Sequence, residues 1–315
     1  MRRPVIIASI LALLSACDKP KAPPAAAAPD RPLTSLSAQS TILFNVFGDA
    51  TAPRVVPIAV VEGGRVAELV LDAAGWRQLD SMFLAKGRTL TVYRDGAAAG
   101  EFTVTRPMFT DEGALYALPG CQLLVPQAEG RLSTELAPDA LVDYIASSTP
   151  LAQTAQTERM PKDAAEKGRT LANTIAAARE VGPEELGHLN FDARWLPSGA
   201  GPAKRTLLAS YLDASGGDAG AGAGHSSMIL ALAEDSAGTL VPSYQHVSSG
   251  EARAVDMQRL VNHADLDGDG VDELLIEEWK YAATPEIGVL KYAQGKWRMI
   301  FRVPNEWCLD VKPAP

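Results

Sequence analysis

The sequence predicts a mainly β protein with a helical insert, an α+β chain built from antiparallel β-meanders. Three features predict it. Short apolar runs broken by turn dipeptides begin at Thr41, an Ala-rich segment with helical charge spacing lies in the middle, and an alternating strand lies near the C-terminus. Apolar residues make up 47% of the chain and charged residues 21%, a composition typical of globular proteins that excludes general disorder.

Residues 41–135 are predicted to form an N-terminal β domain. Two pairs of apolar runs there are each separated by a turn dipeptide. They are 58–61 and 66–71 around Gly63-Gly64, and 89–93 and 102–104 around Asp95-Gly96. Both dipeptides are typical of tight β-hairpins, because their residues tolerate positive φ angles.

Residues 136–183 are predicted to form a helical connector. Asp163 and Lys167 are spaced for pairing one helical turn apart, and Gly182-Pro183 stops the run. The apolar face is Ala-rich and carries Leu171 and Ile175. We expect this face to pack on a sheet.

Residues 184–315 are predicted to form a C-terminal β domain. Its clearest strand has apolar side chains at every second position, which indicates a half-buried strand. These are Trp297, Met299, Phe301 and Val303, between Arg298, Ile300 and Arg302. The run 287–293 is its expected hairpin partner, joined to it by Gln294-Gly295.

The first residues resemble an export signal. Arg2-Arg3 precedes an apolar stretch, Val5 to Ala16, that is too short to span a membrane. The stretch ends in Leu14-Ser15-Ala16-Cys17, which resembles the lipobox of bacterial lipoproteins. The resemblance implies that residues 1–16 are a cleaved signal peptide and that Cys17 carries the acyl chains, palmitate among them. The alternative is an ordinary signal peptide with a coincidental cysteine.

Residues 17–40 are predicted to be the lipid anchor and a tether, because Lys19 to Pro32 consists largely of Pro and Ala. The protein is therefore expected in the cell envelope, facing the periplasm. Asp18 resembles an inner-membrane retention signal, but the choice between inner and outer membrane stays open. A net charge of −9 without a basic run argues against nucleic acid as a partner, and leaves the lipid as the link to the membrane.

The segment Asp265-Leu266-Asp267-Gly268-Asp269-Gly270-Val271-Asp272-Glu273 has the spacing of a calcium loop. Oxygen ligands at positions 1, 3 and 5, a glycine at 6 and a carbonyl at 7 suit a hard cation that needs six to eight oxygens. Position 12, a bidentate Glu in an EF-hand, is Ile276 here, inside an apolar strand-like run. An acidic turn that binds nothing is the other interpretation. Without a cation, the crowded carboxylates are expected to repel one another and loosen the loop.

This loop, followed by an apolar strand, resembles the calcium loops of FG-GAP and VCBS repeats, the blades of integrin-type β-propellers. The likeness covers residues 261–303, and the sequence contains one such loop. It implies a propeller-blade-like C-terminal part and a Ca²⁺ ion. Its ligands would be the side chains of Asp265, Asp267, Asp269 and Glu273 and the carbonyl of Val271, with Asp272 as a possible substitute.

Cys121 and Cys308 are the two cysteines that remain once Cys17 carries lipid. An even pair in an oxidising compartment commonly forms a disulfide, so we predict a bond between them. Two free buried cysteines are the alternative.

Two functions are compatible with these features. The first is a lipid-anchored binding or scaffold protein of the cell envelope, stabilised by calcium, with an envelope protein or glycan as partner. The alternative is an envelope hydrolase whose site is assembled only in three dimensions. A concave pocket lined by His225 or His188 with a paired carboxylate would favour the enzyme.

Overall fold

The computed structural model describes residues 32–37, 39–109, 123–136, 142–152, 159–212, 226–236, 239–250, 254–280, 285–304 and 308–309. The predicted signal peptide, Cys17, Asp18 and most of the predicted tether lie outside these residues. Among the described residues, no helix has both the length and the apolar character needed to cross a membrane. All of them belong to one compact unit, which begins at Arg31.

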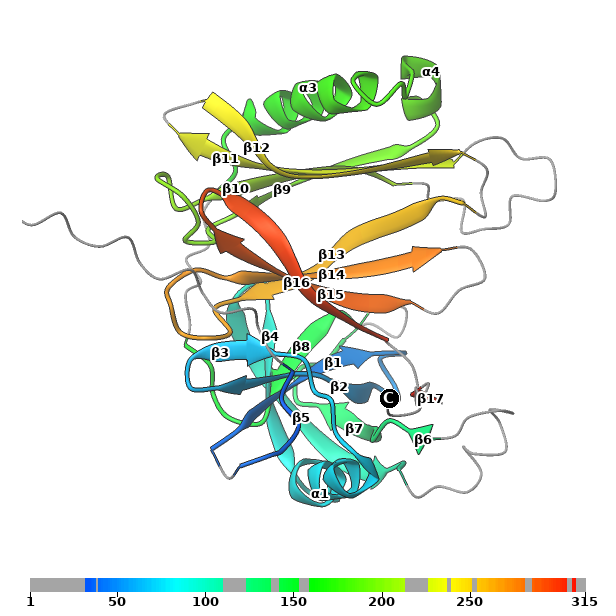
Figure 1. The fold of residues 1–315 in the computed structure, drawn as a ribbon, viewed down its shortest axis with the longest axis vertical. Helices are drawn as coiled ribbons and strands as arrows, with labels where there is room; N and C mark the ends of the chain where they lie inside the picture. The colour runs from blue at the N-terminus through cyan, green and yellow to red at the C-terminus, as the bar shows by residue number, and fades with distance from the viewer. Residues whose placement is uncertain are drawn as a thin grey trace, which may run out of the picture. The chain divides into compact units, whose positions relative to one another are not determined.

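The first part of the chain forms an antiparallel β-barrel (Figure 1). Six of the described strands follow one another in the order β1-β8-β4-β5-β7-β2, and a further pairing of β1 with β2 closes the ring. The short strand β3 pairs with β2 in an antiparallel hairpin. The bounds are β1 (Thr41–Phe47), β2 (Arg54–Glu62), β3 (Arg65–Ala67), β4 (Thr89–Arg94), β5 (Ala97–Pro107), β7 (Ala128–Leu132) and β8 (Tyr144–Ser147). The predicted antiparallel, mainly β class is confirmed.

Strand β8 corrects the prediction for residues 136–183. This segment does contain a helix, but β8 lies in it as well, paired with β1 on one side and β4 on the other. All four residues of β8 are buried, with Tyr144 and Ile145 in the barrel core. Without β8, the edges of β1 and β4 would leave their backbone groups unpaired, so ring closure overrides the helical pattern around it.

Helix α1 (Ala73–Phe83) was not predicted from the sequence. It begins at Asp72, whose side chain accepts a 2.8 Å hydrogen bond from the Gly75 amide. Trp76, Leu79 and Phe83 lie on its buried face and join the barrel core. The capping aspartate and the apolar spacing of three and four residues are the signals that could have revealed it.

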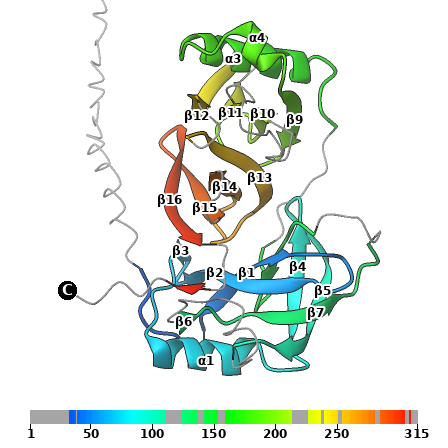
Figure 2. The ribbon, with the colours of Figure 1, turned by 90° about the vertical axis from the view of Figure 1, so that its right-hand side faces the viewer.

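The second part of the chain forms two four-stranded antiparallel meanders, one after the other. The orders are β12-β11-β10-β9 and β13-β14-β15-β16, and the second can be followed in Figure 2. The bounds are β9 (Asn190–Leu196), β10 (Thr206–Leu212), β11 (Ser226–Ser236), β12 (Thr239–Gly250), β13 (Asp256–Ala264), β14 (Glu273–Lys280), β15 (Glu286–Ala293) and β16 (Lys296–Pro304).

The sheet β13–β16 is buried on both faces. Successive residues of β14 point to opposite sides: Leu274 and Ile276 join a core shared with β9 and β10, whereas Leu275 joins the barrel core. The continuous apolar run in β14 is explained by this two-sided burial. Arg259 in β13 adds a polar link to the barrel, because its guanidinium contacts both Asp143, next to β8, and Glu277 in β14.

Helix α3 (Ala164–Ala177) covers the other face of the β9–β12 sheet, as expected. Ala172 and Ala176 pack against Tyr211 of β10, and Ile175 is buried. The predicted pair of Asp163 with Lys167 is confirmed at 2.8 Å. A short helix, α4 (Pro183–Leu186), follows it.

The three predicted turns are confirmed. Gly63-Gly64 joins β2 to β3, Asp95-Gly96 joins β4 to β5, and Gln294-Gly295 joins β15 to β16. All six residues have positive φ angles. Because this backbone conformation matches the twist of two-residue hairpins, the dipeptides determine these turns locally.

The predicted disulfide concerns a residue outside the described part of the chain, Cys121. However, the two-residue strands β17 (Cys308–Leu309) and β6 (Leu123–Leu124) pair with each other, and Cys308 is opposite Leu124. Cys121 lies three residues from Leu124 in the sequence, and three residues reach at most about 11 Å.

We therefore predict that non-reduced peptide mapping of the purified protein will recover the Cys121 and Cys308 peptides as one linked species. Reduction should separate them, and a Cys121→Ser variant should yield a free Cys308 thiol. Alkylation of both cysteines in the native, unreduced protein would contradict the bond.

Candidate metal centre

The acidic loop connects β13 to β14 and begins directly after the buried residue Ala264. Gly268 and Gly270 have φ angles of +80° and +85°, a conformation that L side chains rarely adopt. These two glycines allow the chain to turn tightly between the acidic residues. The spacing of the two glycines therefore determines where the loop turns.

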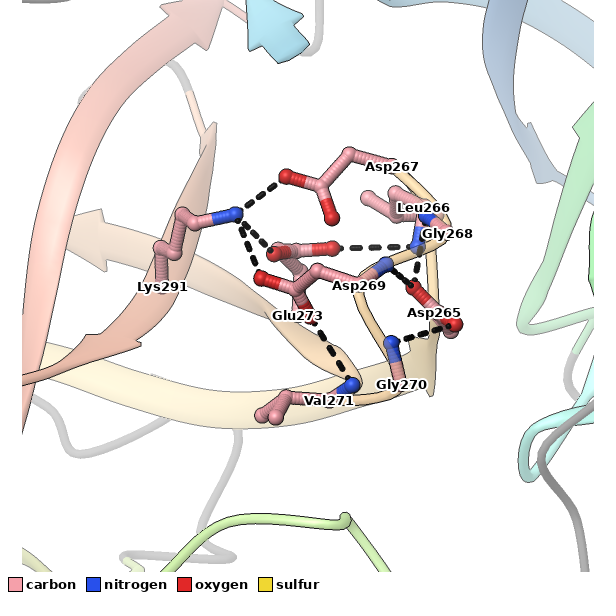
Figure 3. Close-up of polar contacts among 9 residues, drawn as sticks. All are labelled: Asp265, Leu266, Asp267, Gly268, Asp269, Gly270, Val271, Glu273 and Lys291. Atoms are coloured by element: carbon pink, nitrogen blue, oxygen red, sulfur yellow. Dashed lines mark hydrogen bonds and ion pairs between the residues drawn. The ribbon is translucent and has the colours of Figure 1, made fainter. Parts of the chain in front are cut away.

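Asp265 is the centre around which the loop is wound (Figure 3). Its Oδ1 accepts hydrogen bonds from the amides of Gly268, at 2.8 Å, and Asp269, at 3.1 Å, and its Oδ2 accepts one from Gly270 at 3.0 Å. Two further carboxylates close the loop: Glu273 accepts from the Leu266 amide, and Asp269 accepts from the Val271 amide. The loop is thus formed by its own hydrogen bonds.

The carboxylates of Asp265, Asp267 and Asp269 converge, with one oxygen of each lying within 4.8 Å of the others, so this group could hold a metal ion. The Asp267 side chain is only 3% exposed, and its Oδ1 has no hydrogen-bond partner among the described residues. Figure 3 shows this oxygen pointing toward the Glu273 carboxylate, into the cluster. A buried carboxylate oxygen without a donor is costly unless a cation or water satisfies it.

Lys291 of β15 supplies a cation to the same cluster (Figure 3). Its Nζ contacts Asp267 Oδ2, lies 3.1 Å from Asp269 Oδ2 and lies 3.2 Å from Glu273 Oε1. The expectation that nothing offsets the repulsion among the carboxylates is therefore wrong. The ammonium group offsets part of it, because its positive charge lies among three of the four carboxylates.

Burial and the neighbouring charges shift the pKa values of Glu273, Asp265 and Lys291. Burial, and then the negative charge of Asp267, raise the pKa of Glu273 to about 8, although Lys291 acts in the opposite direction. Burial also raises the pKa of Asp265. For Lys291, burial opposes the charged form, but the carboxylates of Asp267 and Glu273 outweigh it and raise the pKa. The lysine is charged at neutral pH.

The loop also lies where three sheets meet. From the β9–β10 turn, the Ser198 carbonyl accepts a 2.8 Å hydrogen bond from the Asp272 amide. A Cβ atom added to Gly199 would overlap the carbonyl oxygen of Gly270, so the two backbones are in direct contact. From the barrel, Gly64 approaches the Asp267 carbonyl, which a Cβ atom on Gly64 would meet at 3.7 Å.

Of the two residues that precede Ala264, Asn262 attaches the chain to the β4–β5 hairpin and His263 contacts the loop. The Asn262 amide donates to the Tyr93 carbonyl, and its Oδ1 accepts from the Asp95 amide, both at 3.0 Å. His263 Nδ1 lies 2.6 Å from Asp272 Oδ2, and both side chains are almost fully buried. His263 therefore braces the loop from outside the acidic cluster.

The structure brings together four of the five predicted ligands: Asp265, Asp267, Asp269 and Glu273. Val271 is in the same loop, with its amide bonded to Asp269. Asp272, the possible substitute, pairs with His263 instead. Sequence reasoning missed Lys291 and the contact with Ser198 and Gly199, since neither is near the loop in the sequence.

A separate concavity of about 580 Å³ lies between α3, α4, β9 and β10. Arg169 lies at one side, with its guanidinium 4.2 Å from the centre of the Phe191 ring. Asn173 lies at another, where its Oδ1 accepts a 2.7 Å hydrogen bond from Tyr211. None of the described residues that line it is a histidine or a carboxylate. His188 is not in this lining, and His225 lies outside the described residues.

Comparison of the chain with protein-family models, with curated proteins and with solved structures found no match.

Proposed function

We propose that this protein is a lipid-anchored binding or scaffold protein of the cell envelope whose folded part is stabilised by a Ca²⁺ ion in the 265–273 loop. The observation that carries the proposal is the convergence of the Asp265, Asp267 and Asp269 carboxylates, in which one buried oxygen of Asp267 has no donor among the described residues. The lipobox resemblance at Leu14–Cys17 supports the lipid anchor.

The chemistry of the ligand set favours calcium. Every candidate ligand is an oxygen, supplied by Asp265, Asp267, Asp269, Glu273 and the Val271 carbonyl, and hard oxygen donors select Ca²⁺ over softer transition metals. The nearby imidazole of His263 is directed to Asp272. No nitrogen or sulfur ligand is therefore needed to describe the site.

The position of the loop favours a structural role for the ion. The loop contacts the β9–β10 turn through Asp272 and approaches Gly64 of the barrel through the Asp267 carbonyl, and Asn262, just before the loop, bonds the β4–β5 hairpin. A cation that fixes the loop would therefore favour the folded arrangement of all three sheets. A binding or scaffold role uses such a rigid body, and the pocket at α3 and α4 offers a concavity of the size that small ligands occupy.

Calcium is expected to stabilise the full-length protein, purified in detergent. With a Kd of about 10⁻⁴–10⁻³ M, typical of extracellular modules, 1 mM Ca²⁺ would add about 0.4–1.4 kcal/mol by mass action. This corresponds to a rise in melting temperature of about 1–4 °C, measured by thermal unfolding with Ca²⁺ or with a chelator.

Asp267→Ala or Asp269→Ala should abolish this response, because each removes a ligand. The control is Asp192→Ala on β9, an aspartate about as exposed as Asp269, which should keep the response. If neither the wild type nor the Lys291 variant described below shows a shift or heat of binding at millimolar Ca²⁺, the loop is an acidic turn and the calcium proposal fails.

A further inference from the structure

The ammonium group of Lys291 occupies the place where the acidic oxygens converge. It contacts one oxygen each of Asp267, Asp269 and Glu273, and these residues are three of the four predicted side-chain ligands of the metal. The Glu273 side chain is 1% exposed and that of Asp267 is 3% exposed, so water cannot readily replace the cation there. The cluster is thus already supplied with a positive charge from within the chain.

A metal ion and this ammonium group would share the same carboxylates: Asp267 offers a metal its Oδ1, which has no donor among the described residues, while its Oδ2 already contacts Nζ. A metal held by Asp267, Asp269 and Glu273 would coordinate either the oxygens that now accept from Nζ or the other oxygens of these carboxylates. In either case two cations would lie within a few ångströms of each other at a largely dehydrated position, where their repulsion is strong. Simultaneous occupation is therefore electrostatically unfavourable.

We propose that Lys291 is a built-in competitor of the metal, so that a divalent cation binds the 265–273 loop only when the ammonium group leaves it. This inference rests on the calcium site proposed above and defines how its occupancy is regulated. In the absence of metal, Lys291 keeps the loop closed. When metal binds, the side chain is released to water.

The competition also determines which cations can bind. A monovalent ion would replace one unit charge by another, and would have to lose its own hydration shell without any gain in attraction. A divalent ion brings twice the charge of the ammonium group to a cluster that contains three aspartates, which a single positive charge does not neutralise. The loop should therefore discriminate against Na⁺ and K⁺ and respond to Ca²⁺.

The release of Lys291 requires no change in the backbone. The side chain is 27% exposed, so its flexible stem already reaches the surface. In the β15–β16 ladder its neighbour is Arg298, whose side chain points to solvent and bonds Gln294. Repulsion from Arg298 should direct the freed ammonium group away from that strand and into water.

The first arm of the test compares Ca²⁺ affinity in the full-length protein and in Lys291→Met, by titration calorimetry. The apparent affinity of the wild type is the intrinsic affinity multiplied by the fraction of molecules in which Lys291 has left the loop. Because this fraction is small, the variant should bind Ca²⁺ about ten-fold more tightly or better. The control is Lys280→Met, the same change of charge at an exposed lysine of β14, which should bind like the wild type. Lys291→Gln provides a second variant if Lys291→Met does not fold.

The second arm uses the wild type alone and follows the amine itself. Acetylation with an N-hydroxysuccinimide ester, quantified at Lys291 by peptide mass spectrometry, should rise several-fold with millimolar CaCl₂. It should not rise with NaCl at the same ionic strength, and acetylation of Lys280 should not respond to either salt.

The outcomes separate this inference from the calcium proposal. Tighter binding by the Lys291 variants together with Ca²⁺-dependent acetylation supports the competition. Equal affinities with unchanged acetylation overturn it and leave the calcium site intact. Absence of Ca²⁺ binding in the wild type and in both Lys291 variants overturns both.

Discussion

Replacement of Cys17 by serine is expected to abolish lipid attachment and to move the mature protein out of the membrane fraction. The serine hydroxyl is not the thiol to which the acyl-bearing group is transferred in lipoproteins, so the chain would lose its acyl anchor. Two or three acyl chains give stable anchoring, whereas an acidic protein without them has no electrostatic attraction to an anionic membrane. Almost complete loss from the membrane is therefore expected.

The decisive measurement is incorporation of an alkyne-labelled palmitate, followed by detergent phase separation. The wild type should carry the label and enter the detergent phase. The Cys17→Ser protein should carry no label, even if some of it stays membrane-associated through an uncleaved leader. Cys121→Ser is the control and should behave like the wild type. A wild-type protein without label would show that the lipobox resemblance is misleading.

Replacement of Gly199 by alanine is expected to cost about 2–5 kcal/mol of unfolding free energy, from left-handed backbone strain plus overpacking. Gly199 has a φ angle of +72°, which alone disfavours alanine. Its new Cβ atom would also overlap the Gly270 carbonyl and lie 3.2 Å from the Val271 Cα. Both neighbours are backbone atoms, so neither can move without disturbing the acidic loop.

The matched control is Gly295→Ala. Gly295 has a φ angle of +76°, and a Cβ atom there would meet nothing within 4 Å. This control isolates the strain, at about 1–2 kcal/mol, and the difference between the two variants in urea unfolding measures the clash. Equal losses would mean that the β9–β10 turn does not pack against the loop. The Gly199 variant should also show a weaker calcium response, because Gly270 and Val271 are displaced.

Some features of the fold could be predicted because they depend on neighbouring residues alone. Gly63-Gly64, Asp95-Gly96 and Gln294-Gly295 form turns because their residues accept positive φ angles, wherever the strands later pack. The acidic loop is similar, since Asp265 binds amides only three to five residues away. Helix α1 was missed even though it has the same kind of local signal, in Asp72 and the apolar residues that follow.

Other features depend on which strands pair, and no local pattern encodes that. Residues 144–147 look compatible with a helical neighbourhood, but the barrel needs a strand between β1 and β4. The two meanders after residue 190 were predicted as one β domain. The alternation of apolar and polar residues identifies single strands, but it does not reveal where one sheet ends and the next begins.

The sequence by itself determined the turns and the β class, and it also predicted the export signal and the candidate ligands Asp265, Asp267, Asp269 and Glu273, because each of these patterns depends on residues close together in the chain. Only the tertiary structure decided which cation these ligands meet. The β14–β15 register pairs Leu274 with Leu290, and one step further along the ladder it places Lys291 beside Glu273. A shift of one residue would point Lys291 to the opposite face of the sheet and leave the carboxylates without their internal cation.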